Sequence, residues 1–246
     1  MSKYLFERDF RPDYLKWMQK CERGSLKTNP FSKEVVNHTL KDLEELQNEI
    51  IRENDSALAY FFATEFNYKP YRMQKLILDS KDAKYACLFA QNIKNCDIKA
   101  LQQIVVDSRK VKYICRFACF VKEANRKPLE NIILKSKNVK YAHMYLKHVN
   151  GVNVKKFQDI ILASGKPRYL FELAKHTKDP QRVKQIEELI ITSGSFTYMR
   201  MFAERIKLAN VEKIEQAVLD SDNISEIKKF AHYVKKSRMK RFFLVL

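Results

Sequence analysis

Apolar residues recur along the chain in short blocks at helical spacing. From Tyr85 to Ala90 they fall at i, i+3, i+4 and i+5, and Leu101, Ile104 and Val105 share one face of the block that follows. Polar residues of the kinds that cap helices separate the blocks. The pattern therefore predicts pairs of short helices rather than strands.

The two blocks together form an internal repeat. A phrase that ends in serine returns at separations of 28, 28, 28, 29 and 28 residues, at Ser80, Ser108, Ser136, Ser164, Ser193 and Ser221. A second phrase keeps this step and begins at Tyr85, Tyr113, Tyr141, Tyr169 and Tyr198. Because one 28-residue helix pair cannot bury its own apolar face, the pairs are expected to stack. The sequence predicts an all-α, right-handed α-solenoid of about six 28-residue two-helix repeats.

Side chains that can cap helices stand at the expected helix starts. They precede the second helices at Asp97, Asn125, Asn153 and Asn210, and the first helices at Asp82, Asn138, Ser195 and Asn223. In the repeat with the 29-residue step, the cap candidate Asp179 follows Tyr169 after 10 residues instead of 12, and Ser193 follows after 14 instead of 11. This spacing predicts a shorter loop and a second helix that is longer by nearly one turn.

The repeats divide the chain into three parts. Residues 1–48, which include Trp17, are expected to form an N-terminal helical cap, residues 49–235 the tandem repeats, and residues 236–246 a basic and apolar C-terminal tail. The tail ends in FFLVL, which is too short to span a membrane, so we expect it to pack on the last repeat or to join a partner. Terminal repeats that look like caps predict an elongated monomer, which a compact radius in light scattering would contradict.

Composition excludes several classes of protein. With 4 Gly and 6 Pro the chain has few residues for tight turns, and it has no glycine-rich phosphate loop. It has no apolar run of 18 residues and no signal peptide, so we expect an intracellular protein that is not secreted. The five cysteines form no CxxC, and Cys115 and Cys119 lie in an apolar helical run, so we expect no metal and no cofactor.

The chain is strongly basic. Its 47 Lys and Arg against 29 Asp and Glu give a net charge of +18. Such a charge attracts nucleic acid, an anionic membrane surface or an acidic protein. The chain is also rich in Lys, Asn, Ile and Tyr, which is typical of an AT-rich genome, so the charge alone leaves a compositional origin open.

Basic residues gather in columns, a column being the same position in successive repeats. The first basic column lies directly before the repeat tyrosines and consists of Lys84, Lys112, Lys140 and Arg168. The second basic column, three residues earlier, consists of Lys81, Arg109 and Lys137. A helix dipole disfavours a cation at the first turn by about 0.3–1 kcal/mol, so the recurrence indicates a reason outside the helix. At about 10 Å per repeat the first basic column would span about 30 Å, which is roughly one turn of duplex DNA. The backbone N–H groups at the starts of these helices would also face a bound phosphate.

These columns predict a non-enzymatic module that binds a nucleic-acid backbone, DNA or RNA, without sequence specificity. The alternative is a scaffold for protein–protein interaction, whose charge binds an acidic protein or keeps the array soluble. The repeat tyrosines could stack on bases, but an apolar residue four positions after each one favours a place in the core with the hydroxyl at the rim.

The repeats resemble the short tandem helical repeats of large DNA viruses of protists and of some phages, and more loosely HEAT and TPR arrays. One repeat matches their Tyr-x-x-x-Phe-Ala and Ser positions at Tyr113, Phe117, Ala118 and Ser136. Another matches at Tyr198, Phe202, Ala203, Asn210, Val211, Ile214 and Ser221. The resemblance covers residues 55–235 and implies a solenoid, a viral protein in the host cytoplasm or virus factory, and no common activity. Such arrays often carry glycine at the position of the second basic column. In this chain only two later repeats have glycine there, at Gly165 and Gly194.

A third interpretation is an enzyme similar to the helical-repeat alkylpurine DNA glycosylases, which hold a carboxylate and aromatic residues in a basic groove. The candidate carboxylates are Asp79, Asp107 and Asp220, each directly before a repeat serine. Their recurrence indicates a structural place at a helix end, whereas a catalytic site breaks the symmetry of repeats. The sequence therefore predicts a protein that is not an enzyme.

Overall fold

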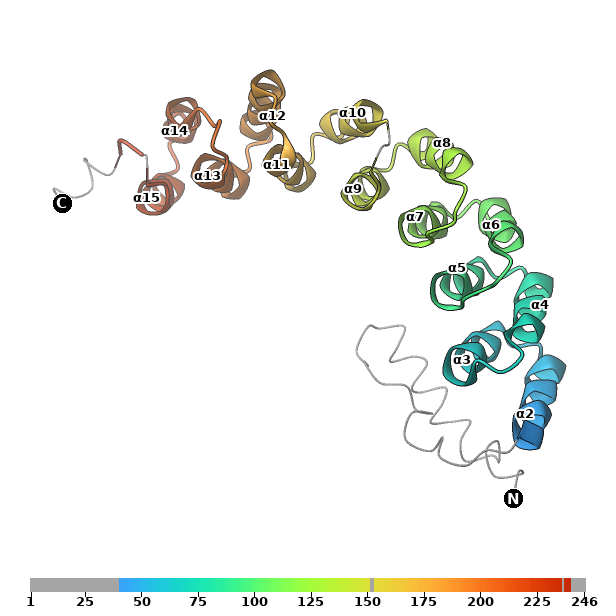
Figure 1. Ribbon diagram of the computed structural model, residues 1–246. Helices are drawn as coiled ribbons and strands as arrows, with labels where there is room; N and C mark the ends of the chain where they lie inside the picture. Colours follow the sequence, from blue (N-terminus) through green and yellow to red (C-terminus); the bar gives the residue numbers. More distant parts are fainter. Residues whose placement is uncertain (1–39, 151–152, 236, 240–246) are drawn as a thin grey trace. The chain divides into compact units, whose positions relative to one another are not determined.

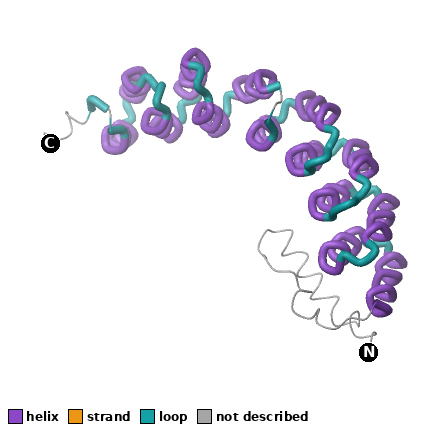
Figure 2. The backbone as a smooth tube through the Cα atoms, in the orientation of Figure 1, coloured by secondary structure: helices purple, strands orange, loops and turns teal. Residues whose placement is uncertain are grey.

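The described part of the protein is all-helical. A computed structural model describes residues 40–150, 153–235 and 237–239, in which fourteen helices and no strand are found (Figures 1 and 2). The all-α prediction is confirmed for these residues. Most of the expected N-terminal cap, with Trp17, and the FFLVL end of the tail lie outside them.

The helices alternate between two kinds. The first helices of the repeats are α3 (Ser56–Phe66), α5 (Ala83–Asn92), α7 (Val111–Phe120), α9 (Val139–His148), α11 (Pro167–His176), α13 (Phe196–Arg205) and α15 (Ile224–Tyr233). The second helices are α2 (Leu40–Glu53), α4 (Pro70–Ser80), α6 (Ile98–Asp107), α8 (Arg126–Ser136), α10 (Val154–Ser164), α12 (Pro180–Thr192) and α14 (Val211–Leu219).

Neighbouring helices pack in pairs, within two compact units. Unit 1 comprises residues 1–113 and 121–124, and unit 2 comprises residues 114–120 and 125–246. In unit 1, α3 packs on α4 and α5 on α6, while α3 also contacts α5 and α4 contacts α6. In unit 2, α9 packs on α10 and α11 on α12, while α11 contacts α13 and α12 contacts α14. These helices thus pack on their pair partners, and α3, α4, α11 and α12 also contact the like helix of the next pair.

Two columns of the second helices form the centre of the packing. The first core column consists of Met73, Leu101, Leu129, Phe157, Ile186 and Ile214. The second core column, four residues further along each helix, consists of Ile77, Val105, Ile133, Ile161, Ile190 and Val218. Every one of these side chains is at most 1% exposed. The i, i+4 spacing places both columns on the same face of each helix, which explains the apolar periodicity of the sequence.

The repeat serines join each second helix to the first helix that follows. The hydroxyl of Ser136 donates to the carbonyl of Ile133 at 2.6 Å and accepts the N–H of Asn138 at 3.3 Å. The same two bonds are made by Ser80, Ser108, Ser164, Ser193 and Ser221. Because a helix leaves its last carbonyls without intrahelical partners, a hydroxyl at this position stabilises the junction.

A polar column connects each second helix with the start of the next one. Gln74 Oε1 accepts the N–H of Asp97 at 3.0 Å, and Glu187 Oε2 accepts the N–H of Asn210 at 2.7 Å. Glu130 makes the equivalent contact with Asn153 at 3.5 Å. The sequence carries Gln or Glu throughout this column, at Gln74, Gln102, Glu130, Gln158, Glu187 and Glu215. Sequence analysis missed the column, although its 28- and 29-residue steps follow those of the serines.

Most of the predicted caps are confirmed. Side-chain oxygens accept first-turn amides at Asp82, Asp97, Asn138, Asn153, Asp179, Asn210 and Asn223. Asn125 and Ser195 stand at the N-cap position without a side-chain cap bond. The 29-residue step is also confirmed: α12 has 13 residues where α10 has 11, and only residues 177–179 join it to α11.

The expected boundary after residue 48 falls inside a helix. Helix α2 runs from Leu40 to Glu53, packs on α3 and α4, and buries Leu46 and Ile50. These two residues precede Met73 and Ile77, of the two core columns, by 27 positions each. Helix α2 is therefore a second helix in register with the repeats. No helix in the described residues is long and apolar enough to cross a membrane.

Candidate nucleic-acid interface

The first basic column occupies the same place in each first helix. Lys84, Lys112, Lys140 and Arg168 are the second residues of α5, α7, α9 and α11. Lys112, Lys140 and Arg168 are exposed, and Lys84 is half-buried. Lys84 and Lys112 belong to unit 1, and Lys140 and Arg168 to unit 2, so each unit carries a pair of these cations.

Three of these cations have no carboxylate close enough to neutralise them. Within the described residues, no Asp or Glu oxygen lies within 4.0 Å of the charged groups of Lys112, Lys140 or Arg168. By contrast, Lys175, another cation of α11, is paired with Glu172 at 3.1 Å. The unpaired charges are therefore available to an anion from outside the chain.

Three cations of the column, Lys84, Lys112 and Arg168, lie beside the repeat tyrosine that follows each of them. Lys84 Nζ is 4.8 Å from the centroid of the Tyr85 ring and 3.3 Å from the hydroxyl to which it donates. The Lys112 Nζ lies 5.4 Å from its neighbouring ring, and the Arg168 guanidinium 5.9 Å. Such contacts are worth about 0.5–1 kcal/mol at exposed sites, so they hold the cations close to the surface.

The repeat tyrosines are occupied by packing within the protein. Tyr85 is buried, which raises the pKa of its hydroxyl, while the tyrosines at 113, 141, 169 and 198 are half-buried. The Tyr169 ring lies 5.5 Å from His143, and the Tyr198 ring lies 6.2 Å from Phe171. The predicted core position is thus reached fully only at Tyr85. Rings that pack on neighbours leave less surface on which a base could stack.

The helix-start amides differ between the repeats. On α5 the Asp82 carboxylate accepts the N–H groups of Lys84 and Tyr85, and on α9 the Asn138 side chain accepts the N–H of Lys140. The expectation that these amides face a phosphate is therefore wrong for α5 and α9. At α11 the cap residue is Lys166, which adds a cation and makes no side-chain cap bond. Pro167 has no N–H, and the N–H of Tyr169 donates to the Lys166 carbonyl at 3.0 Å, so only the Arg168 amide is left for an anion in this first turn.

The second basic column lies at residues with left-handed backbone. Lys81, Arg109 and Lys137 have φ of 55°, 54° and 49°, and all three are exposed. The later repeats place Gly165, Gly194 and Asp222 in the same conformation. This conformation explains the glycine of the similar repeats, because a residue without Cβ adopts it at no steric cost. The three cations therefore stand where glycine would be less strained.

Replacing Lys137 with glycine is expected to stabilise the protein by about 1 kcal/mol. A left-handed residue with a Cβ costs roughly 1–2 kcal/mol, part of which is offset by the greater freedom of glycine in the unfolded chain. Urea unfolding of Lys137→Gly and Lys137→Ala separates this effect from the loss of charge, because alanine keeps the strain. A glycine variant that is no more stable than the alanine variant would contradict the assignment of strain.

A third basic column was missed by the sequence analysis. It lies in the N-terminal part of the second helices and consists of Lys99, Lys127, Lys155 and Lys184, all of them exposed. The first three are the second residues of α6, α8 and α10, and Lys184 is the fifth residue of the longer α12. Their steps of 28, 28 and 29 residues are visible in the sequence. Because a short loop joins the end of each first helix to the second helix, this column lies at the opposite edge of each helix pair from the first basic column.

The candidate carboxylates of an enzyme are ordinary helix-end residues. Asp79, Asp107 and Asp220 are exposed, and the latter two accept hydrogen bonds at 2.8 Å from Gln103 and Gln216, one turn earlier. The structure brings none of the three to a buried position.

The cysteines of the described residues are unbridged. The sulfur atoms of Cys115 and Cys119 are 4.0 Å apart, and neither Cys87 nor Cys96 forms a disulfide, while Cys21 lies outside the described residues. In the described part of the chain, no group of three or more His, Cys, Asp or Glu side chains could hold a metal ion.

No family model, no curated protein and no solved structure matches this chain.

Proposed function

We propose that the protein is a non-enzymatic module that binds a nucleic-acid backbone without sequence readout, through the first basic column. The observation that carries the proposal is the recurrence of Lys112, Lys140 and Arg168 as exposed cations without an ion pair, each the second residue of its helix. In this proposal the chain is a right-handed α-solenoid of about six 28-residue repeats that acts as a monomer inside the cell.

The energetics of the helix starts support a ligand outside the chain. A cation in the first turn opposes the helix dipole by about 0.3–1 kcal/mol, and this occurs in four successive first helices. The second basic column adds Lys81, Arg109 and Lys137 within three residues, each in a conformation that favours glycine. Binding of phosphates would offset both the unfavourable helix-dipole interaction and the backbone strain, since each neutralised phosphate releases a bound counterion.

The chemistry of these side chains fits backbone contact rather than base recognition. Lysine is a compact charge on a flexible stem, which suits a phosphate and discriminates little between bases. Tyr85 and Tyr169, which follow Lys84 and Arg168, pack on Tyr60 and His143 instead of standing clear of the surface. The proposed module therefore binds duplexes and single strands of many sequences.

Titration of labelled duplex DNA, duplex RNA and single strands in an electrophoretic shift assay tests the proposal. If about four cations neutralise phosphates, log K is expected to fall with log salt concentration at a slope of roughly −3 to −4. Changing the base sequence is expected to leave the affinity within about threefold. The scaffold alternative is tested in the same assay by adding an acidic polypeptide of equal charge, which competes with the labelled nucleic acid.

Two outcomes decide against nucleic acid. The first is no binding at about 50 mM salt, where counterion release is strong. The second is displacement by the acidic polypeptide at equal charge concentration, which would favour a scaffold for an acidic protein.

A further inference from the structure

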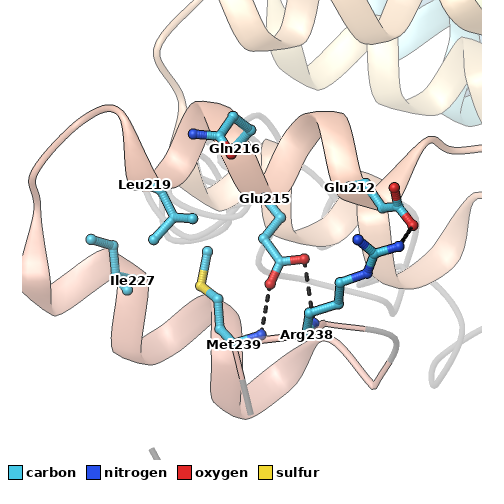
Figure 3. Close-up of a pocket in the computed structure, with 7 residues that line it drawn as sticks. All are labelled: Glu212, Glu215, Gln216, Leu219, Ile227, Arg238 and Met239. Atoms are coloured by element: carbon cyan, nitrogen blue, oxygen red, sulfur yellow. Dashed lines mark hydrogen bonds and ion pairs between the residues drawn. The ribbon is translucent and has the colours of Figure 1, made fainter. Parts of the chain in front are cut away.

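A pocket of about 590 Å³ lies beside α14 and α15 at the end of unit 2. Leu219, Ile227 and Met239 contribute apolar side chains to its lining, and Glu212 pairs with Arg238 beside them (Figure 3). Leu219, the last residue of α14, is 38% exposed. The pocket therefore presents an apolar surface on α14.

In the earlier repeats the corresponding surface is covered by the next second helix. Helix α12 contacts α14, α8 contacts α10, and α4 contacts α6. No described helix follows α15, so no described helix takes this place against α14. The position of the pocket is thus the position of a further second helix.

The buried carboxylate of Glu215 fixes the register of the chain that follows α15. Glu187 accepts the N–H of Asn210, the N-cap residue of α14, which lies 23 positions further along. Glu215 accepts the N–H of Arg238, also 23 positions further, at 3.3 Å and that of Met239 at 2.8 Å (Figure 3). Arg238 therefore holds the place that Asn210 holds one repeat earlier.

The register extends the two core columns to the last residues of the sequence. Adding 28 to Ile214 and Val218 gives Phe242 and Leu246, both apolar. The residue between them, Leu244, falls in a column whose described members are all exposed and polar: Lys75, Gln103, Asn131, Asp159, Glu188 and Gln216. Residues 240–246 lie outside the described part of the chain.

We propose that residues 240–246 bind in this pocket, with Phe242 and Leu246 in the places that Ile214 and Val218 hold one repeat earlier. The repeat array then extends to the last residue of the sequence. The pocket is an internal packing site and not a site for a small ligand. The C-terminal residues are a part of the repeats, in place of the separate tail expected from residue 236.

Two acidic substitutions, two positions apart, test the register in the full chain. Phe242→Asp is expected to increase amide hydrogen exchange in α14 and α15 by about tenfold or more, because nearest-neighbour packing is what protects a repeat. Leu244→Asp, with the same change of chemistry, is expected to leave that exchange unchanged. Equal effects of the two variants, or no effect of Phe242→Asp, would overturn the proposal.

A fluorescence measurement keeps the test decisive if an acidic variant fails to fold. Trp17 is the only tryptophan, so Trp17→Phe gives a background without emission. In that background, Phe242→Trp is expected to emit at shorter wavelength and to resist quenching by iodide, while Leu244→Trp is quenched as an exposed indole. Equal quenching of the two would overturn the proposal, and would be the result if the pocket were kept for a separate partner.

Discussion

Replacing Lys84, Lys112, Lys140 and Arg168 with glutamate is expected to lower nucleic-acid affinity at least about 100-fold at 0.1 M salt. The variant removes four favourable phosphate contacts and places four like charges against the backbone. Exposed charges contribute at most about 1 kcal/mol each to stability, and these four oppose their helix dipoles, so the melting temperature is expected to change little. The electrophoretic shift assay and thermal unfolding of the same preparation provide both readouts.

The third basic column supplies a matched control. Replacing Lys99, Lys127, Lys155 and Lys184 with glutamate changes the net charge by the same amount at the opposite edge of the helix pairs. This variant is expected to keep most of the affinity, with only the loss due to long-range charge. If both variants lose binding equally, the chain binds through its net charge, and the assignment to the first basic column is wrong.

Replacing Glu187 with leucine is expected to destabilise the protein by about 1–3 kcal/mol. Its carboxylate is 2% exposed and accepts the N–H of Asn210 at 2.7 Å, so leucine leaves that donor without its acceptor. Glutamine keeps the acceptor, and three members of this polar column, Gln74, Gln102 and Gln158, are glutamine already. Glu187→Gln is therefore expected to fold as well as the natural chain or better.

The natural chain and Glu187→Gln differ in how their stability depends on pH. Burial raises the pKa of Glu187 above 4.5, more than the N–H of Asn210 lowers it. The folded state then holds the proton more tightly than the unfolded state, so the stability that this group gives is complete below about pH 4.5 and declines as pH rises through the raised pKa. Urea unfolding at pH 5 and pH 8 is expected to show a growing advantage of Glu187→Gln. A constant difference between these pH values would contradict the raised pKa.

The helix pairs could be predicted because a single period governs both burial and caps. Ile133 and Ile161 are 28 residues apart and equally buried, so the apolar pattern marks the same face in each repeat. The longer α12 could be predicted because Asp179 and Ser193 mark both of its ends. Both inferences rest on the recurrence of residue types at fixed positions of the repeat. The packing of the helices depends on the same recurrence.

Details of the candidate site depend on side-chain direction, which periodicity does not contain. Asn125 and Asn138 are the same residue type at helix starts, yet only Asn138 accepts a first-turn amide with its side chain. The sequence places the cations and tyrosines in adjacent columns, but it does not show that Tyr169 packs on His143 of the preceding first helix. The third basic column, by contrast, is visible in the sequence itself, because Lys99, Lys127, Lys155 and Lys184 follow the steps of the repeat.

The hydrogen bonds between repeats all join residues that are close in the sequence. Gln47 reaches Tyr68 across 21 positions, Cys115 reaches Tyr141 across 26, and Tyr60 accepts from Asn92 across 32. A gene duplication or deletion of one whole 28-residue segment would therefore keep the serine and polar columns in register at the new junction. A shift of a few residues would break the serine and polar columns together. Such a chain can change its length over generations in whole steps, and with it the number of cations it presents.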